Sequence, residues 1–87
     1  MNYHRWHKRV SDSDTSPCFA SRLEELMIDL DLSNREFVKP LYLDARVISY
    51  WLHGDREPKV SAIINICNVY NVSADWLLGL SDRKERE

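Results

Sequence analysis

Residues 33–54, which read SNREFVKPLYLDARVISYWLHG, predict two short helices joined by a tight turn. A capping box opens the first helix, because the Ser33 hydroxyl can accept from the backbone N–H of Glu36 while the Glu36 carboxylate accepts from that of Ser33. Pro40 removes one intrahelical hydrogen bond and crowds the preceding turn, a defect of about 3 kcal/mol in a regular helix interior. We therefore expect a helix that starts at Asn34, is short or distorted in its last turn, and buries Phe37, Val38 and Leu41.

The second helix of the pair is expected from Ala45 to about Leu52. Asp44 is a favoured N-cap residue, and Gly54 is a natural stop because glycine adopts a left-handed conformation without strain. The helical spacing turns three apolar side chains inward, those of Val47, Ile48 and Trp51.

Another helix should precede this pair. Ser16 is predicted as its N-cap and Pro17 as its first helical residue. Asp31 should end it. Between these limits apolar residues recur on one helical face, at Phe19, Leu23, Leu26 and Leu30.

Two more helices are expected after the pair. One runs from about Val60 and stops at Asn71, a residue type that tolerates the left-handed conformation. Its expected buried face consists of Val60, Ile63, Ile64, Cys67 and Tyr70. The other is short and capped by Ser73, and it contains Trp76, Leu77 and Leu78 before Gly79 closes it.

The pattern as a whole predicts an all-α protein with five short helices and no strand. Its second and third helices form a helix-turn-helix. Residues 1–15 are expected to form a flexible N-terminal segment, residues 16–82 the helix-turn-helix domain, and residues 83–87 a charged C-terminal tail.

The composition fits one small domain. The 87 residues are 44% apolar and 30% charged, enough for a single modest core. No apolar run is long enough to span a bilayer, the N-terminus lacks the apolar core of a secretory signal, and two cysteines fit a reducing compartment. We therefore expect a cytoplasmic protein.

Nothing in the sequence points to an enzyme or to a cofactor. There is no glycine-rich phosphate loop, and the nucleophile candidates are not placed beside a positioned base. His4 and His7 with Cys18 would supply only three metal ligands, so no metal site is expected. The net charge of −2 provides no basic footprint for nucleic acid either, so such a function must depend on local placement.

A set of residues recurs at the spacing of a known family. They are Arg22-Leu23, Leu32-Ser33, Ile48-Ser49, Trp51, Gly54, Pro58 and the run VSADWLLGLSD at residues 72–82, the most specific piece. Together they resemble the Cro/lambda-repressor-type (Xre-like) family of helix-turn-helix DNA-binding domains. The resemblance extends without a gap from Phe19 to Asp82, about 64 of the 87 residues, and implies a compact lambda-repressor-like domain.

The resemblance implies a sequence-specific DNA-binding transcriptional regulator of the phage-repressor type. Such a protein acts as a homodimer on a palindromic operator in double-stranded DNA, with a recognition helix, here about residues 45–52, in the major groove. The base-reading positions fall on Ala45, Arg46, Ser49 and Tyr50, and the phosphate-contacting positions on Ser33, Asn34, His53, Arg56 and Lys59. Arg46 is the strongest candidate, since a guanidinium can donate two hydrogen bonds to guanine O6 and N7, whereas capping alone would explain Ser33.

The sequence departs from the family in ways that keep a second function open. Tyr42 stands in the turn where the family has glycine, and a left-handed conformation would cost it about 1–2 kcal/mol. Met27 and Ile28 are expected to be exposed and to form an apolar patch with Leu30. The alternative is a protein-protein interaction module, antitoxin-like or an anti-regulator, that binds a partner through this patch and binds DNA weakly or not at all.

Two further segments are candidate contact regions. The C-terminal cluster of Trp76, Leu77, Leu78 and Leu80 is a candidate dimer interface, although the first two can equally complete the core. The N-terminal segment is either a basic arm for a minor groove or an unstructured tail, and its basic side chains are His4, Arg5, His7, Lys8 and Arg9, interleaved with Tyr3 and Trp6.

Overall fold

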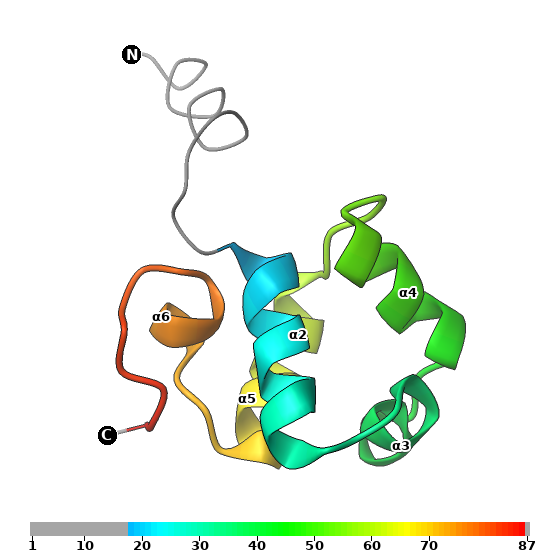
Figure 1. The fold of residues 1–87 in the computed structure, drawn as a ribbon, viewed down its shortest axis with the longest axis horizontal. Coiled ribbons are helices and arrows are strands. Elements are labelled where there is room, and N and C mark those ends of the chain that lie inside the picture. The colour runs from blue at the N-terminus through cyan, green and yellow to red at the C-terminus, as the bar shows by residue number, and fades with distance from the viewer. Residues whose placement is uncertain (1–17, 87) are drawn as a thin grey trace.

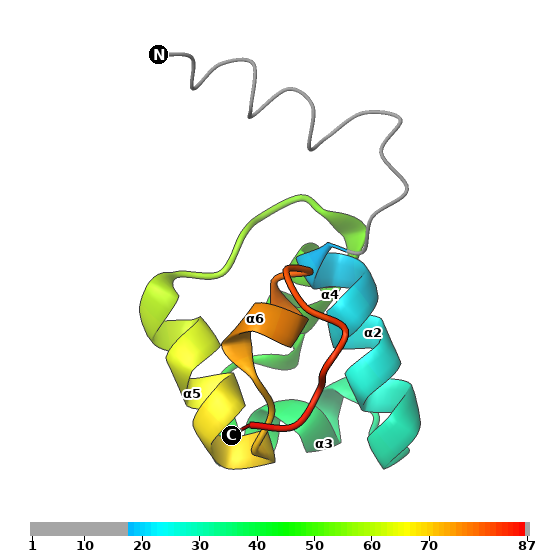
Figure 2. The same cartoon turned by 90° about the vertical axis from the view of Figure 1, so that its left-hand side faces the viewer.

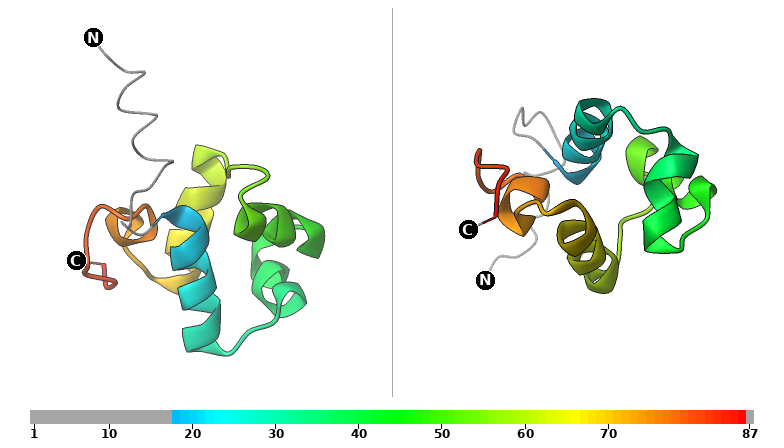
Figure 3. Two further views of the ribbon diagram at one scale, coloured as in Figure 1. Left: turned by 45° about the horizontal axis from the view of Figure 1, so that its top comes forward. Right: turned by 90° about the horizontal axis from the view of Figure 1, so that it is seen from below.

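The computed structural model describes residues 18–86, which form five α-helices and one 3-10 turn (Figure 1). In chain order they are α2 (Phe19–Leu30), α3 (Asn34–Val38), η1 (Lys39–Leu41), α4 (Ala45–His53), α5 (Val60–Tyr70) and α6 (Ala74–Leu77). The all-α prediction is confirmed, since the described residues contain no strand, only an isolated antiparallel bridge between Val72 and Glu85. None of these helices is both long and apolar enough to cross a membrane. Helices α2 and α5 lie between α6 on one side and the α3–α4 pair on the other (Figures 1 and 3).

Helix α2 begins at Phe19, with Cys18 as its N-cap. The predicted cap Ser16 and first residue Pro17 lie outside the described residues. The predicted end is confirmed. Asp31 adopts the left-handed conformation with φ 57°, and its backbone N–H donates to the carbonyl of Ile28 at 3.1 Å.

The prediction that Met27 is exposed is wrong, because this side chain is only 6% exposed. Leu23, Leu26 and Met27 follow one another at spacings of three and one, which places all three on the stripe that faces the core. Ile28, the next residue, points away from that stripe and is 69% exposed. The exposed apolar patch on α2 is therefore reduced to Ile28 and Leu30.

The capping box and the distortion predicted for the next helix are both confirmed. The Ser33 backbone N–H donates to Glu36 Oε1 at 2.8 Å, and the Glu36 backbone N–H donates to Ser33 Oγ at 3.2 Å. The hydrogen bond from the Ser33 backbone N–H, and after it the Ser33 side chain, lower the pKa of the Glu36 carboxyl. The last turn around Pro40 is the 3-10 turn η1, and Tyr42 ends it in the left-handed conformation with φ 58°.

Helix α4 follows its predicted course. The Asp44 side chain caps it by accepting from the backbone N–H of Arg46 at 2.9 Å, and Gly54 ends it with φ 76°. Ile48 and Trp51 are buried on the core side, and Val47 is half-buried. One face of α4 is thereby anchored, which leaves the opposite face available to solvent.

The buried face predicted for α5 is partly wrong. Val60 is exposed and Ile64 is 55% exposed, whereas Ile66, which was not predicted, is 0% exposed. The face that packs against the core runs through Ile63, Ile66, Cys67 and Tyr70. Helix α5 is apolar around much of its circumference, so two stripes at helical spacing compete and only packing selects one.

Two aromatic pairs hold the helix-turn-helix against the rest of the domain. The rings of Phe37 on α3 and Tyr70 on α5 are stacked with centroids 4.5 Å apart, and the Tyr70 hydroxyl donates to the Phe37 carbonyl at 2.7 Å. Phe19 on α2 meets Trp51 on α4 edge to face at 5.8 Å. These contacts fix both helices of the pair relative to α2 and α5.

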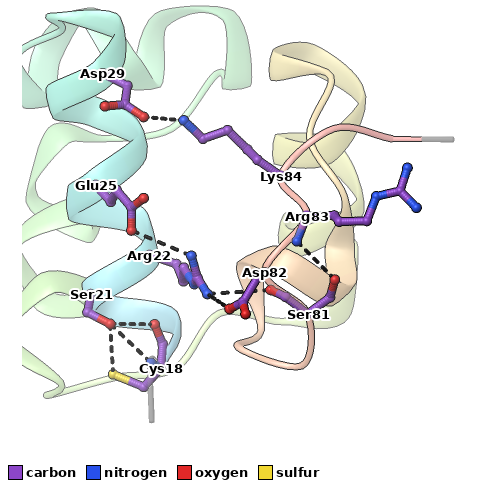
Figure 4. Close-up of polar contacts among 9 residues, drawn as sticks. All are labelled: Cys18, Ser21, Arg22, Glu25, Asp29, Ser81, Asp82, Arg83 and Lys84. Atoms are coloured by element: carbon purple, nitrogen blue, oxygen red, sulfur yellow. Dashed lines mark hydrogen bonds and ion pairs between the residues drawn. The ribbon is translucent and has the colours of Figure 1, made fainter. Parts of the chain in front are cut away.

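The segment after α6 turns back across α6 and runs beside α2 (Figure 2). The buried Arg22 side chain lies over the Trp76 ring, 4.7 Å from its centroid. It also donates to the Ser81 carbonyl and to Asp82 Oδ1, each at 3.4 Å (Figure 4). Lys84 forms an ion pair with Asp29, and Arg86 donates to the carbonyl of Cys67 at 3.1 Å. Within the described chain, the part of the expected tail at 83–86 thus lies against α2 and α5.

Candidate nucleic-acid interface

The solvent face of α4 carries the four predicted base-reading residues. Arg46 is 82% exposed along its side chain, and Tyr50 is 37% exposed. Ala45 and Ser49 are half-buried, and Ala45 packs against the core cluster. The structure therefore brings together two long side chains that reach outward and two short ones close to the helix surface.

Arg46 is held by the carboxylate that caps its own helix. Its Nε donates to Asp44 Oδ1 at 3.3 Å and its Nη2 donates to Asp44 Oδ2 at 2.9 Å. The Arg46 side chain, and then its backbone N–H, lower the pKa of the Asp44 carboxyl from 3.8 to about 2, so that this group stays ionised at pH values below its ordinary pKa. The sequence predicted the cap but not this ion pair, for which the spacing Asp-x-Arg at a helix start was the available signal.

The start of α3 is tied to the middle of α4. The Asn34 side-chain amide donates to Ser49 Oγ at 3.4 Å, which joins a predicted phosphate contact to a predicted base contact. Ser33 lies one residue earlier, and its hydroxyl is engaged in the capping box. Asn34 and Ser49 thus lie side by side on one surface, while Ser33 serves the helix itself.

A second cluster lies at the end of α4. The Arg56 guanidinium lies over the Tyr50 ring, with its central carbon 4.3 Å from the ring centroid. His53 is exposed, and its Nδ1 lies 2.8 Å from the Ser49 carbonyl oxygen. Lys59 is exposed at the N-cap of α5. The stacking of Arg56 on Tyr50 was not predicted, because five residues lie between them and Arg56 follows the end of the helix.

Between α4 and α5 the surface is hollowed into a groove of about 460 Å³. The residues that line it include Tyr50, Arg56, Lys59 and Asn65. Residues 33–59 carry five basic and four acidic side chains, a balance of +1. The surface therefore has several cations at defined positions but only a weak net positive charge.

The other predicted contact surfaces differ in how far the structure describes them. On α2 only Ile28 and Leu30 remain as exposed apolar residues of the patch. In the C-terminal cluster Trp76 and Leu77 are buried, whereas Leu78 and Leu80 are exposed. The predicted N-terminal arm, with His4, Arg5, His7, Lys8 and Arg9, lies outside the described residues.

Comparison with known proteins supports the architecture. No protein-family model matches the chain, and no curated protein matches it in sequence. The crystal structure of a transcriptional regulator from Listeria innocua is similar, with a TM-score of 0.66 and 23% sequence identity. The two chains share a fold. The similarity covers 79% of this chain but only 64% of the Listeria chain, less than two thirds of that protein.

Proposed function

We propose that this chain is a sequence-specific DNA-binding transcriptional regulator of the phage-repressor type, and that α4 enters the major groove of double-stranded DNA. The observation that carries the proposal is the solvent face of α4, where Arg46 and Tyr50 extend outward from a helix anchored by Ile48 and Trp51. The fold shared with the Listeria transcriptional regulator supports it, as does the resemblance to the Cro/lambda-repressor-type (Xre-like) family.

Each side chain of this surface has a role that follows from its chemistry. Arg46 donates a bidentate pair to guanine, and Ala45 contacts a thymine methyl group. Ser49 and Tyr50 reach a base edge or the adjoining backbone. The phosphates are contacted by Asn34 before α4, by the N-cap region of Ser33, and by the cations that follow α4, namely His53, Arg56 and Lys59.

The proposed assembly is a homodimer on a palindromic operator. Two recognition helices about 34–36 Å apart would read successive major grooves on one side of the duplex. Leu78 and Leu80 offer exposed apolar surface for such a dimer. Trp76 and Leu77 do not, because the protomer buries them in its own core.

The proposal is tested by selecting binding sites from a random duplex pool and then measuring affinity by fluorescence anisotropy over a range of salt concentrations. We expect an enriched palindrome and an affinity that falls steeply as salt rises, because bound phosphates release counterions. Replacing Arg46 by alanine should remove about 1–3 kcal/mol of discrimination at one base pair. The matched control is Arg83→Ala, which removes the same charge on the C-terminal segment beside α2 (Figure 4) and should leave the sequence preference unchanged. Failure to select any sequence, even at low salt, would contradict the proposal.

A second candidate is a protein-protein interaction module, favoured by the exposed Ile28 and Leu30 among acidic residues of α2. In this case Ile28→Glu should abolish binding of the partner, because it places a charge in an apolar contact, while it leaves the fold intact. Isothermal titration of the purified partner against both proteins measures the effect. Equal affinity of the partner for the variant and for the original chain would exclude this surface.

A further inference from the structure

The Asp44 carboxylate makes three hydrogen bonds within its own helix start. Its Oδ1 accepts from the Arg46 backbone N–H at 2.9 Å and from Arg46 Nε at 3.3 Å, and its Oδ2 accepts from Arg46 Nη2 at 2.9 Å. The backbone bond fixes the carboxylate in space, since the N-cap geometry sets where its oxygens point. The two side-chain bonds then fix the guanidinium, although Arg46 is highly exposed and would otherwise sample many rotamers.

The hydrogen bonds to Asp44 occupy one edge of the Arg46 guanidinium and leave its outer edge free to contact a base. A guanidinium has five N–H donors, and the pairing with Asp44 uses only the edge formed by Nε and one N–H of Nη2. The outer edge, formed by Nη1 and the second N–H of Nη2, keeps two parallel donors, which match the O6 and N7 acceptors of guanine.

The same pairing changes what Arg46 does toward the DNA backbone. A carboxylate in direct contact offsets most of the charge of the guanidinium, so the pair is attracted to phosphate much less than a lone arginine. Asp44 would repel phosphate if it stood alone. Paired with Arg46, it instead reduces contacts that carry no sequence information.

We propose that Asp44 is a positioning residue for base readout, which holds Arg46 in the orientation that reads guanine and withholds it from phosphates. The inference rests on the proposed DNA-binding function, in which Arg46 reads guanine, and adds to it the residue that orients Arg46 for this contact. Asp44, although acidic and on the proposed DNA-binding surface, would then contribute to sequence specificity rather than only repel phosphates.

The test replaces Asp44 by serine, which is an equally favoured N-cap residue and so keeps the start of α4 while it removes both side-chain bonds to Arg46. The control is Glu24→Gln, which removes one negative charge from the exposed side of α2. Circular dichroism of both variants verifies that the helices are retained. The selected operator is then compared with operators changed at each guanine, and affinity for an unrelated duplex is measured as a function of salt.

Three results are expected from Asp44→Ser. A bidentate arginine contact discriminates guanine from other bases by roughly 5- to 140-fold, and the variant should lose at least about threefold of this ratio at one position. Its affinity for the unrelated duplex should rise. The slope of log affinity against log salt should steepen by about 0.9, as expected for one added phosphate contact. Glu24→Gln should change none of these quantities.

The outcomes separate this inference from the function on which it rests. If the original chain selects a guanine-containing operator, and Asp44→Ser keeps the full discrimination, the role of Asp44 is overturned while the DNA-binding function stands. If the original chain shows no preference among duplexes, the proposed function is refuted, and the inference with it.

Discussion

Replacing Tyr42 by glycine should stabilise the domain, although it removes a large aromatic side chain. Tyr42 ends the turn before α4 with φ 58° and ψ 42°, and its backbone N–H donates to the Lys39 carbonyl at 3.2 Å. The residue is 93% exposed, so its ring makes almost no packing contacts that glycine would lose. The substitution therefore acts mainly through the backbone.

The expected magnitude is the difference of two terms. A left-handed conformation costs a residue with a β-carbon about 1–2 kcal/mol, and glycine relieves this strain. Glycine also gives the unfolded chain more freedom, which takes back about 0.4–1 kcal/mol. The net gain in the free energy of unfolding is about 0.8 kcal/mol, which corresponds to a rise in Tm of roughly 3–6 °C for a domain of this size.

Thermal unfolding followed by circular dichroism measures the effect, and the chain contains a matched control. Asn71 ends α5 at φ 56°, nearly the same backbone conformation, but asparagine tolerates this conformation with little strain. Asn71→Gly should therefore yield a smaller gain than Tyr42→Gly, or a loss. The reasoning would be refuted by a fall in Tm for Tyr42→Gly, or by an equal gain for the two variants.

Three other predictions concern the scaffold and its dependence on pH. Tyr70→Phe keeps the aromatic stack but leaves the Phe37 carbonyl without its hydrogen bond, and urea unfolding should show a loss of about 1–3 kcal/mol. Ile66→Ala should cost about 2–5 kcal/mol in the same assay, whereas Ile64→Ala, on the exposed side of α5, should change stability by less than about 0.5 kcal/mol; equal losses would mean that the wrong stripe of α5 is buried. Because the pKa of the Asp44 carboxyl is lowered from 3.8 to about 2, the stability it supplies is present above pH 3.8 and is lost as the pH falls toward about 2. Asp44→Asn should accordingly lose less stability than the original chain over that interval, and an identical acid dependence would count against the ion pair.

Much of the fold could be predicted because local chemistry specifies the ends of these helices. Ser33, Asp44 and Ser73 each accept a backbone hydrogen bond at a helix start, and such caps can be recognised from a few neighbouring residues. The left-handed ends at Asp31 and Asn71 have the same local origin. The sequence-based predictions of buried helix faces were wrong where burial depends on which other parts of the chain pack against the helix.

The orientation of α5 and the burial of Met27 are the clearest examples. Two apolar stripes of α5 satisfy helical spacing and both contain Tyr70, and the stripe that is buried includes Ile66 rather than Ile64. Met27 adjoins Leu26 in sequence, and both lie within the wide core-facing stripe of α2. In each case more than one apolar face is compatible with the sequence, and packing in the core decides which residues are buried.

The candidate interface was located by resemblance, and its side-chain geometry was not predictable. Arg46 and Tyr50 were predicted to contact bases, but their contacts with Asp44 and Arg56 depend on side-chain rotamers and on the path of the loop. The stacking of Arg56 on Tyr50 requires the loop after Gly54 to turn back along α4, which no local signal specifies. The pairing of Asp44 with Arg46 is local, and it could have been anticipated from the two charges at the helix start.

The long return of the C-terminal segment has a consequence for how the chain is made. Arg22 and Asp29 are synthesised early, yet their partners Asp82 and Lys84 follow 60 and 55 residues later. At the usual rate of about 5–20 residues per second, a ribosome leaves Arg22 without this partner for roughly 3–12 s. During that interval α2 can form but cannot bury its cation against Asp82. The described domain therefore closes late, when residues 81–84 leave the ribosome and reach α2.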